Sequence, residues 1–312
     1  MKRIQYHRYG GPDVLRYEEF EPGRPGQGQI LVRVKAASAN PVDYKVRNGM
    51  LKLMTGFRFP RAMGSDYAGI VEAVGSAVTR LKVGAEVFGT AALKAGGAFA
   101  ERIVADEARA VAKPASLSFV QAAALPVIGA TAWCGLVQKA HLKSGQSVFI
   151  HGCLGGVGRI AVQLAKMLGA QVAGSCRGTE LTAARALGVD PVVDFQRFTV
   201  DSLKGRFDVV FDTAGSLTLS DGRALIKRGG MVLDINPTLP KIVGSVFTTG
   251  HRFLMANPSA AVLASIAEAA AAGKLVVPVG RTVPLSEAIA ALTEWEQTGV
   301  PKGKLIIVPT DA

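Results

Sequence analysis

The sequence predicts an α/β protein in which a doubly wound parallel sheet is joined to a second, β-rich domain. Three observations lead to this prediction. The chain has 312 residues, about twice the length of a typical domain, so two hydrophobic cores are expected. From Ala122 onward, short apolar runs alternate with helical stretches, a pattern typical of parallel strands connected by crossover helices. The glycine-rich turn HGCLGGVG, residues 151–158, stands between the first such run and the first such helix.

The N-terminal part of the chain, residues 1–121, has the pattern of a β-rich unit. Short β-like runs are separated there by Gly and Pro, namely ILVRVKAAS, GIVEAV, AEVFGT and ERIVA. Similar pieces, KLVVPV and KLIIVP, return near the C-terminus. We therefore expect one domain of residues 1–121 and 277–312 and a second domain of residues 122–276.

The central part of the chain, residues 122–276, has the alternating pattern. It opens with the helical stretch AAALPVIGATAWCGLVQKA. Strands are expected in SVFI, QVAGS, VVDF, DVVFDTAG and GMVLDIN. Helices are expected over 156–169, 180–187 and 218–227, and an Ala-rich helix over 258–272, because Ala is the best helix former. A last helix is expected in SEAIAALTEW, outside this domain.

The composition is that of an ordered globular protein, with 49% hydrophobic and 19% charged residues. No apolar run has the length of a membrane span, and MKRIQYHRYG lacks the apolar stretch of a signal peptide, so a cytoplasmic protein without membrane contact is expected. The net charge of +12 is scattered along the chain, which favours a solvated basic surface that also attracts a phosphorylated cofactor. A nucleic-acid partner is not expected.

The turn HGCLGGVG predicts a dinucleotide site. Cys153 occupies the place where the common fingerprint has its first glycine, and a residue that small suits the turn. Glycine at 155 lets the backbone approach a pyrophosphate, and glycine at 158 lets the helix pack close to the strand. The expected contacts are Gly152, Gly155, Gly156, Val157 and Gly158. Asp212 and Gly215, in FDTAGS, follow a later strand at the edge where open α/β sheets bind ligands.

The residues after the second strand of this domain predict which nucleotide binds. A protein that binds NAD normally places an acidic residue there, on the ribose hydroxyls. This sequence has Ser175 and Arg177, and its next acidic residue, Glu180, falls in the expected helix. A hydroxyl and a guanidinium suit a 2′-phosphate, because a charge-assisted hydrogen bond strengthens binding. The sequence therefore predicts NADPH rather than NADH.

Together these motifs resemble the medium-chain dehydrogenase/reductase superfamily, and within it the zinc-independent NADPH:quinone oxidoreductases. The resemblance covers nearly the whole chain and rests on ASANPVDYKVRNG, MGSDYAGIVEAVG, GGAFAERIVAD, AAALPVIGATAW and HGCLGGVG. It implies a Rossmann domain and a β-rich GroES-like domain. It also implies transfer of a hydride from NADPH to a quinone or an α,β-unsaturated carbonyl.

The resemblance also implies that no metal takes part. Zinc alcohol dehydrogenases hold their metal with soft or imidazole ligands. The corresponding positions here are Asn40 and Ser65, and none of the four histidines stands at ligand spacing with a cysteine. Alcohol oxidation is therefore not expected.

The resemblance further suggests which side chains act. Asn40 and Tyr44 are the expected donors near the substrate oxygen. Asp43 either caps the following turn or has a polar role in the cleft. Thr131 is expected to contact the cofactor, and Lys304 either approaches its phosphate or lies on the surface.

Two further expectations concern the phosphate site and the assembly. Phe195 stands where many relatives have a Tyr beside the adenosine phosphate, which leaves Arg177, together with Arg197, as phosphate ligands. VFTTGHRFLMA, residues 246–256, resembles the strand by which relatives form a homodimer.

Two alternatives to the quinone or enone reductase stay open. One is a reductase of other activated double bonds, in alkenals or acyl thioesters. The other is a non-enzymatic relative that binds NADPH or nucleic acid.

Overall fold

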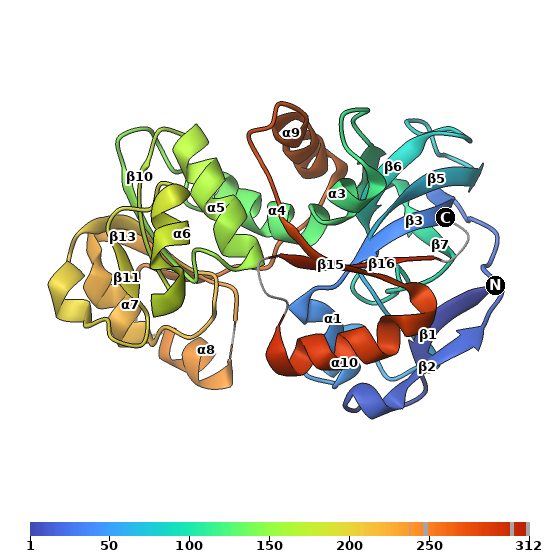
Figure 1. Cartoon of the computed structure of the whole chain (residues 1–312), viewed down its shortest axis with the longest axis horizontal. Helices are drawn as coiled ribbons and strands as arrows, with labels where there is room; N and C mark the ends of the chain where they lie inside the picture. Colours follow the sequence, from blue (N-terminus) through green and yellow to red (C-terminus); the bar gives the residue numbers. More distant parts are fainter. Residues whose placement is uncertain (237, 246–248, 300–302, 310–312) are drawn as a thin grey trace. The chain divides into compact units, whose positions relative to one another are not determined.

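The computed structural model describes residues 1–236, 238–245, 249–299 and 303–309 (Figure 1). The chain divides into two compact units. Unit 1 consists of Met1–Val127, Pro258–Ala272 and Val277–Ala312, and unit 2 of Ile128–Asn257 and Gly273–Val276. The predicted fold class is confirmed, because one sheet is entirely parallel and lies in unit 2, whereas unit 1 is rich in antiparallel strands.

Unit 1 is built on a seven-stranded sheet whose strands run in the order β15-β16-β3-β5-β6-β8, with β7 paired to β3. The strands are β3 (Gln29–Ser38), β5 (Asp66–Val74), β6 (Glu86–Thr90), β7 (Arg102–Asp106), β8 (Ala110–Ala112), β15 (Val279–Pro284) and β16 (Lys304–Val308). In β3 the apolar residues Ile30, Val32 and Val34 alternate with more exposed ones and face the core, as expected for a half-buried strand. A smaller sheet contains β2 (Leu15–Glu19), β1 (Lys2–Tyr6) and β4 (Arg61–Ala62).

Short helices fill the connections of unit 1. They are η1 (Pro12–Val14), α1 (Pro41–Arg47), α2 (Lys52–Thr55), η2 (Glu107–Arg109), α3 (Phe119–Ala123), α9 (Ala260–Ala271), η6 (Leu285–Glu287) and α10 (Ala288–Thr298). Helix α1 begins where the sequence favours a start, because Pro41 takes the first helical position and the Asn40 N–H donates to the Asp43 carboxylate at 2.8 Å. Helix α4 (Pro126–Trp133) also begins at a proline and leads into unit 2.

Unit 2 contains a six-stranded parallel sheet in the order β11-β10-β9-β12-β13-β14. The strands are β9 (Ser147–His151), β10 (Gln171–Cys176), β11 (Val192–Asp194), β12 (Phe207–Asp212), β13 (Ile226–Asp234) and β14 (His251–Phe253). The remaining helices are η3 (Cys134–Lys139), α5 (Gly156–Met167), η4 (Gly178–Glu180), α6 (Leu181–Ala186), η5 (Val200–Leu203), α7 (Leu219–Leu225) and α8 (Leu239–Ser245). Numbered along the chain, the strand order is 3-2-1-4-5-6, which is that of a Rossmann fold, and it reverses between β9 and β12.

Three parts of the chain differ from the expectation. Helix α9, in the segment expected to belong to the nucleotide domain, groups with unit 1 because it contacts β8 and η2. The strand expected in KLVVPV begins only at its last residue, Val279. Residues 251–253 of the proposed dimer segment form β14 beside β13, although the sequence suggested no place for them in a sheet, and residues 246–248 lie outside the described residues.

Within the described part of the chain, no helix is both long enough and apolar enough to cross a membrane.

Candidate functional site

The glycine-rich turn lies after β9, at the point where the strand order of unit 2 reverses. Gly152 has a φ of +79°, which favours glycine, and Gly155 is the N-cap of α5. A Cβ atom on Gly158 would lie 2.1 Å from the Gly152 carbonyl oxygen, so the helix can begin this close to the strand only with glycine there. Gly155 and Gly156 are exposed and Val157 is half-buried. The first N–H groups of a helix lack intrahelical acceptors, so this turn can bind an anion.

Cys153 packs inside the turn. Its side chain is buried, and burial, together with the neighbouring Cys176 thiol, raises its pKa to about 12. At neutral pH the thiol is therefore protonated and is not the activated nucleophile that a helix N-terminus can create.

Ser175, near the end of β10, lies beneath the glycine-rich turn. Its side chain is buried, and its hydroxyl oxygen lies 2.7 Å from His151 Nδ1 and accepts the Gly152 N–H at 3.4 Å. His151 Nε2 in turn lies 2.8 Å from the Ser216 hydroxyl. Ser175 thus joins β9 to β10 beneath the turn, and its contact with the 2′-phosphate stays a prediction.

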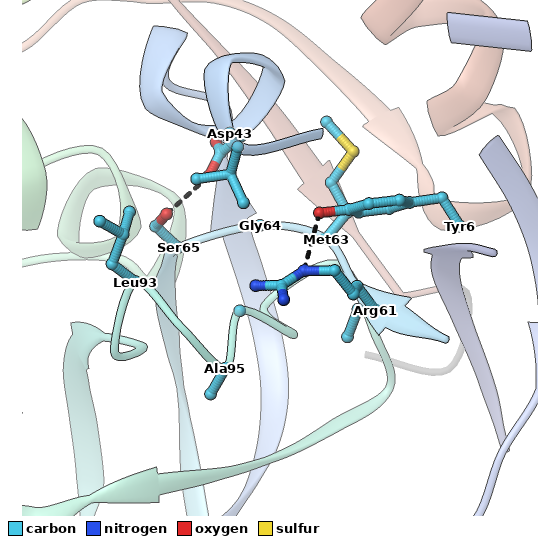
Figure 2. Close-up of a pocket in the computed structure, with 11 residues that line it drawn as sticks. Tyr6, Asp43, Arg61, Met63, Gly64, Ser65, Leu93 and Ala95 are labelled. Carbon is cyan, nitrogen blue, oxygen red and sulfur yellow. Dashed lines mark hydrogen bonds between the residues drawn. The ribbon is translucent and has the colours of Figure 1, made fainter. Parts of the chain in front are cut away.

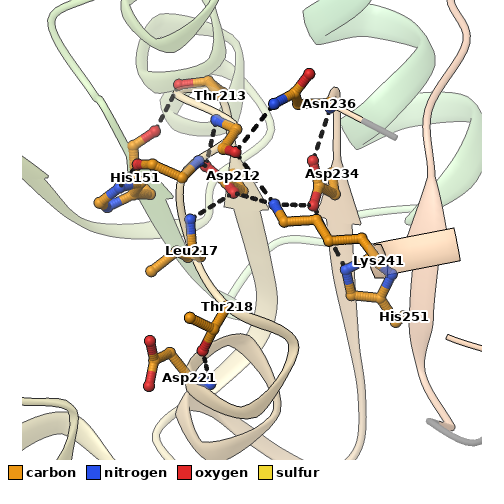
Figure 3. A network of polar contacts seen from close by, with 12 residues as sticks. His151, Asp212, Thr213, Leu217, Thr218, Asp221, Asp234, Asn236, Lys241 and His251 are labelled. Carbon is orange, nitrogen blue, oxygen red and sulfur yellow. Dashed lines mark hydrogen bonds and ion pairs between the residues drawn. The ribbon is translucent and has the colours of Figure 1, made fainter. Parts of the chain in front are cut away.

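Asp212 organises the loop after β12 instead of pointing outward. Its carboxylate accepts N–H groups from Gly215 at 2.7 Å and from Leu217 at 2.9 Å (Figure 3). Lys241, on α8, donates to Asp234 at 2.6 Å and to the Gly215 carbonyl at 3.1 Å, and it lies 3.5 Å from Asp212. The fully buried Asp212 is thereby held by backbone donors and a lysine and shapes the loop, and its contact with the cofactor stays a prediction.

Gly215 is required by the shape of this loop. Its φ is +74°, and a Cβ atom there would lie 2.4 Å from the Cβ of Asn236. The Asn236 amide also donates to the Gly215 carbonyl at 3.3 Å. The loop after β12 and the residues after β13 are therefore packed closely together.

The loop after β10 carries the expected phosphate ligand together with an acidic neighbour. Arg177 is exposed and is the N-cap of η4. A Cβ atom on the next residue, Gly178, would lie 2.5 Å from a carboxylate oxygen of Asp194, which ends β11. Arg197 Nε lies 3.9 Å from that Asp194 carboxylate, and Phe195 is 41% exposed. Asp194 could not be found from the residues that follow β10, because it comes from the next strand, β11, and only pairing of the two strands brings it to this loop.

Thr131 lies in α4, within unit 2, and its side chain is buried. Its contact with the cofactor stays a prediction.

In unit 1 the structure gathers a buried polar network around Asn40. This residue is 0% exposed. Its amide nitrogen donates to Asp66 at 2.9 Å and to the Ser38 carbonyl at 3.3 Å, and its amide oxygen accepts from Lys304 at 2.6 Å. The amide group of Asn40 is therefore engaged inside unit 1, and its expected catalytic role stays a prediction.

Lys304 belongs to the same network. Its ammonium group is buried and also donates to the Ala39 carbonyl at 2.7 Å. Burial lowers the pKa of Lys304, and the nearby carboxylates of Asp66 and Asp43 oppose this change. The alternative of a plain surface lysine is therefore wrong, and the approach to the cofactor phosphate stays a prediction.

Asp43 caps α1, which was one of its two expected roles. Its carboxylate also accepts the Ser65 hydroxyl at 2.6 Å (Figure 2). Burial raises its pKa to about 6. Asp43 and Ser65 line a cavity of about 20 Å³, enough for a water molecule. The tyrosine and arginine on its opposite side, Tyr6 and Arg61, are hydrogen-bonded to each other at 3.2 Å.

Asp66 is the acidic centre of the network and was missed in the sequence. It accepts the amide of Asn40 and the Val127 N–H at the start of α4, the latter at 3.1 Å. Burial raises its pKa to about 7. Its only signal in the sequence was its place in MGSDYAG, beside Ser65.

Tyr44 differs from Asn40 because its side chain is half-buried and reaches the surface of unit 1. Its ring packs edge-on against Trp295, with 5.9 Å between the ring centroids. Burial and the neighbouring Glu296 raise its pKa, so the phenol keeps its proton at neutral pH. Tyr44 can therefore donate a hydrogen bond.

We expect Lys304→Met to lower the free energy of unfolding by roughly 3 kcal/mol at pH 8, because it leaves buried carboxylates without their cation. A carboxyl group with a raised pKa takes up a proton on folding, so its contribution to stability declines as the pH rises through the folded value, about 6 for Asp43 and about 7 for Asp66. The loss should therefore be smaller at pH 5. Urea unfolding at both pH values measures it, with the exposed Lys274→Met as control. Equal losses at both pH values would contradict the assignment.

Two family models match the chain. Residues 26–115 match the alcohol dehydrogenase GroES-like domain, and residues 187–307 match the model described as zinc-binding dehydrogenase. The first match lies within unit 1, and the second includes parts of both units.

Individual proteins match over nearly the full length. The chloroplastic NADPH-dependent alkenal/one oxidoreductase of Arabidopsis thaliana is 34% identical, and the match covers 99% of this chain and 80% of that protein. The quinone oxidoreductase of Coxiella burnetii has a TM-score of 0.88 at 30% identity, with 99% of each chain covered. The Escherichia coli quinone oxidoreductase complexed with NADPH has a TM-score of 0.85 at 27% identity, covering 99% of this chain and 100% of the other. The chain therefore belongs to the medium-chain dehydrogenase/reductase superfamily, in its quinone and alkenal/one oxidoreductase branch.

Proposed function

We propose that this protein is an NADPH-dependent reductase of quinones or α,β-unsaturated carbonyls. The observation that carries the proposal is the glycine turn, where α5 begins at the reversal point of the parallel sheet with its first glycines exposed. The named activities of the Arabidopsis and E. coli relatives support the cofactor and the substrate class. NADPH supplies the hydride, and the conjugated acceptor spreads the arriving charge onto its oxygen.

In this proposal Tyr44 is the residue that donates to the substrate oxygen. Its phenol stays protonated at neutral pH, and its half-buried position leaves it accessible from the surface of unit 1. The start of α1, the helix that carries Tyr44, is held in place by Asn40 together with Asp66 and Lys304. In this proposal these three residues have a positioning role.

The reaction is proposed to need no zinc. The reason lies in the donor set, because the amide of Asn40 and the hydroxyl of Ser65 are poor zinc ligands compared with thiolate or imidazole. In addition, the ammonium group of Lys304 lies 2.6 Å from the Asn40 amide oxygen. A second cation beside it would be repelled.

The proposed activity predicts that the purified protein oxidises NADPH when a quinone or an enone is added. Loss of NADPH absorbance across a panel of quinones, enones, alkenals and acyl thioesters measures the activity and ranks the acceptors. NADPH binding without turnover on any acceptor would instead favour the non-enzymatic alternative.

We expect Tyr44→Phe to lower kcat by at least about tenfold with the Kd of NADPH unchanged. Tyr17→Phe, the same change on β2, is the control.

The cofactor preference is proposed to depend on Arg177. Its guanidinium is exposed on the loop after β10, where the 2′-phosphate of NADPH is expected. Asp194 lies beside this loop and would repel the phosphate, so Arg177 must outweigh it, with Arg197 partly neutralising the carboxylate.

Arg177→Ala should therefore raise the Kd of NADPH by about tenfold to a hundredfold, because a charge-assisted hydrogen bond is lost. The Kd of NADH should stay within about twofold, since NADH lacks that phosphate. Asp194→Asn should lower the Kd of NADPH, because it removes a negative charge that repels the 2′-phosphate. Titration of protein fluorescence with both nucleotides measures these constants. An unchanged Kd of NADPH in Arg177→Ala would refute the assigned role.

A homodimer formed through β14 is also proposed. In the described part of unit 2, β14 pairs only with β13, and an unpaired strand edge favours association with a second copy. The Leu254 N–H donates to the backbone carbonyl of Asp234, on β13. Because successive N–H groups along a strand point to opposite sides, the Phe253 N–H points toward the outer edge of the sheet.

Light scattering at micromolar concentration should give the mass of two chains for the natural protein. Phe253→Pro removes an N–H at the outer edge without removing a hydrogen bond to β13. This variant should have the mass of one chain, with an unchanged circular dichroism spectrum. A dimeric Phe253→Pro variant would show that the interface lies elsewhere.

The cytoplasmic location expected from the sequence stays a prediction, and the Arabidopsis relative is named as chloroplastic.

A further inference from the structure

Unit 1 contains a second pocket, which shares Arg61 with the small cavity beside Asp43 and Ser65 and whose charged lining is entirely basic. It has a volume of about 530 Å³ and is lined by α2, the segment that follows it, and the loop before Gly96. Its charged residues are Arg3, Arg58, Arg61 and Lys94, and no Asp or Glu is among the residues that line it. A concave surface with charges of one sign concentrates counter-ions.

Arg61 is the unusual member of this group, because it is buried without an acidic partner. It is 8% exposed, and its guanidinium donates to the carbonyls of Thr55 at 2.9 Å and Lys94 at 3.0 Å. Within the described ranges of the chain, no carboxylate forms an ion pair with it. Arg47, which is 1% exposed, has the usual arrangement and donates to Glu296 at 2.8 Å. The charge of Arg61 is therefore oriented by neutral groups and left without a counter-ion.

The other three cations leave room for a ligand at the mouth of the pocket. Arg58 and Lys94 are exposed, and among the residues that the structure describes neither side chain has a hydrogen-bond or ion-pair partner. Arg3 is half-buried, with its guanidinium 4.6 Å from the centre of the Phe20 ring, and burial lowers its pKa despite the nearby Glu18. An anion in the pocket would offset the cost of burying this charge.

The geometry points to a binding site for a phosphate group, distinct from the proposed NADPH site, in which Arg58, Arg61 and Lys94 provide the charge. Guanidinium groups match the oxygens of a phosphate, and several cations together favour a ligand with more than one negative charge. Phe57, which is exposed at the rim, can pack against an apolar or aromatic part of such a ligand. The site lies wholly in unit 1 and does not depend on reductase activity.

The test is calorimetric titration of the full-length protein, saturated with NADPH, with inorganic pyrophosphate at low ionic strength. One saturable site per chain is expected. The double variant Arg58→Ala/Lys94→Ala should raise its Kd by about tenfold or more. Arg24→Ala/Lys82→Ala removes the same charge from exposed positions outside the pocket and should leave the Kd nearly unchanged. Unchanged melting temperatures of both double variants show that the fold is retained.

Three outcomes overturn the inference: no saturable binding, an equal loss in both double variants, or loss of binding in Arg177→Ala instead. The last outcome would place pyrophosphate at the proposed nucleotide site, which pyrophosphate can enter only if NADPH does not fill it. Loss of binding in Arg177→Ala therefore also identifies a protein that fails to bind NADPH. A titration with ADP separates the sources of the phosphate. Binding of ADP tighter than that of pyrophosphate, with the difference removed by Phe57→Ala, assigns the site to a phosphate ester that carries an aromatic group. Equal binding assigns it to free phosphate.

Discussion

The proposed nucleotide site depends first on the close contact between the start of α5 and the carbonyl of Gly152. Helix α5 begins so near this oxygen that a Cβ atom on Gly158 would lie 2.1 Å from it. This approach brings the helix N-terminus to the end of β9, where the strand order reverses. The unpaired N–H groups, the exposed Gly155 and Gly156 and the loops after β10 and β12 all meet at that edge. The proposed nucleotide site depends on this one contact.

In unit 1 the main physical constraint is the burial of charged side chains. Lys304, Asn40 and Asp66 form a connected set with almost no solvent exposure, and Asp43 adjoins it through the backbone of Asn40. Each of the two carboxyl groups has a raised pKa because water is excluded, and the ammonium of Lys304 offsets part of that cost. The set joins the end of β3 to the starts of β16, α1 and α4. Residues from distant parts of the sequence thus determine the position of α1 and of Tyr44.

Much of the architecture could be predicted because it depends on local patterns. Alternation of apolar runs and helical stretches identified the parallel sheet, and the glycine turn was placed correctly at the end of β9. The helical stretch expected in AAALPVIGATAWCGLVQKA is divided, because α4 begins anew at Pro126 after α3. The grouping of α9 with unit 1 could not be predicted, because an Ala-rich helix is compatible with many neighbours and its contacts with β8 decide its place.

The sequence by itself determined the fold class, the family resemblance and the glycine turn, because these depend on residues that are adjacent along the chain. The tertiary structure decided the roles of polar side chains. Ser175 and Asp212 were expected at the cofactor, yet both are buried and their oxygens are engaged by neighbouring strands and loops. Lys304 was expected either near a phosphate or on the surface, and it is buried and bound to Asn40, 264 residues away along the chain. A polar group turns inward wherever folding supplies its partners, and those partners come from strands that only the folded sheet brings together.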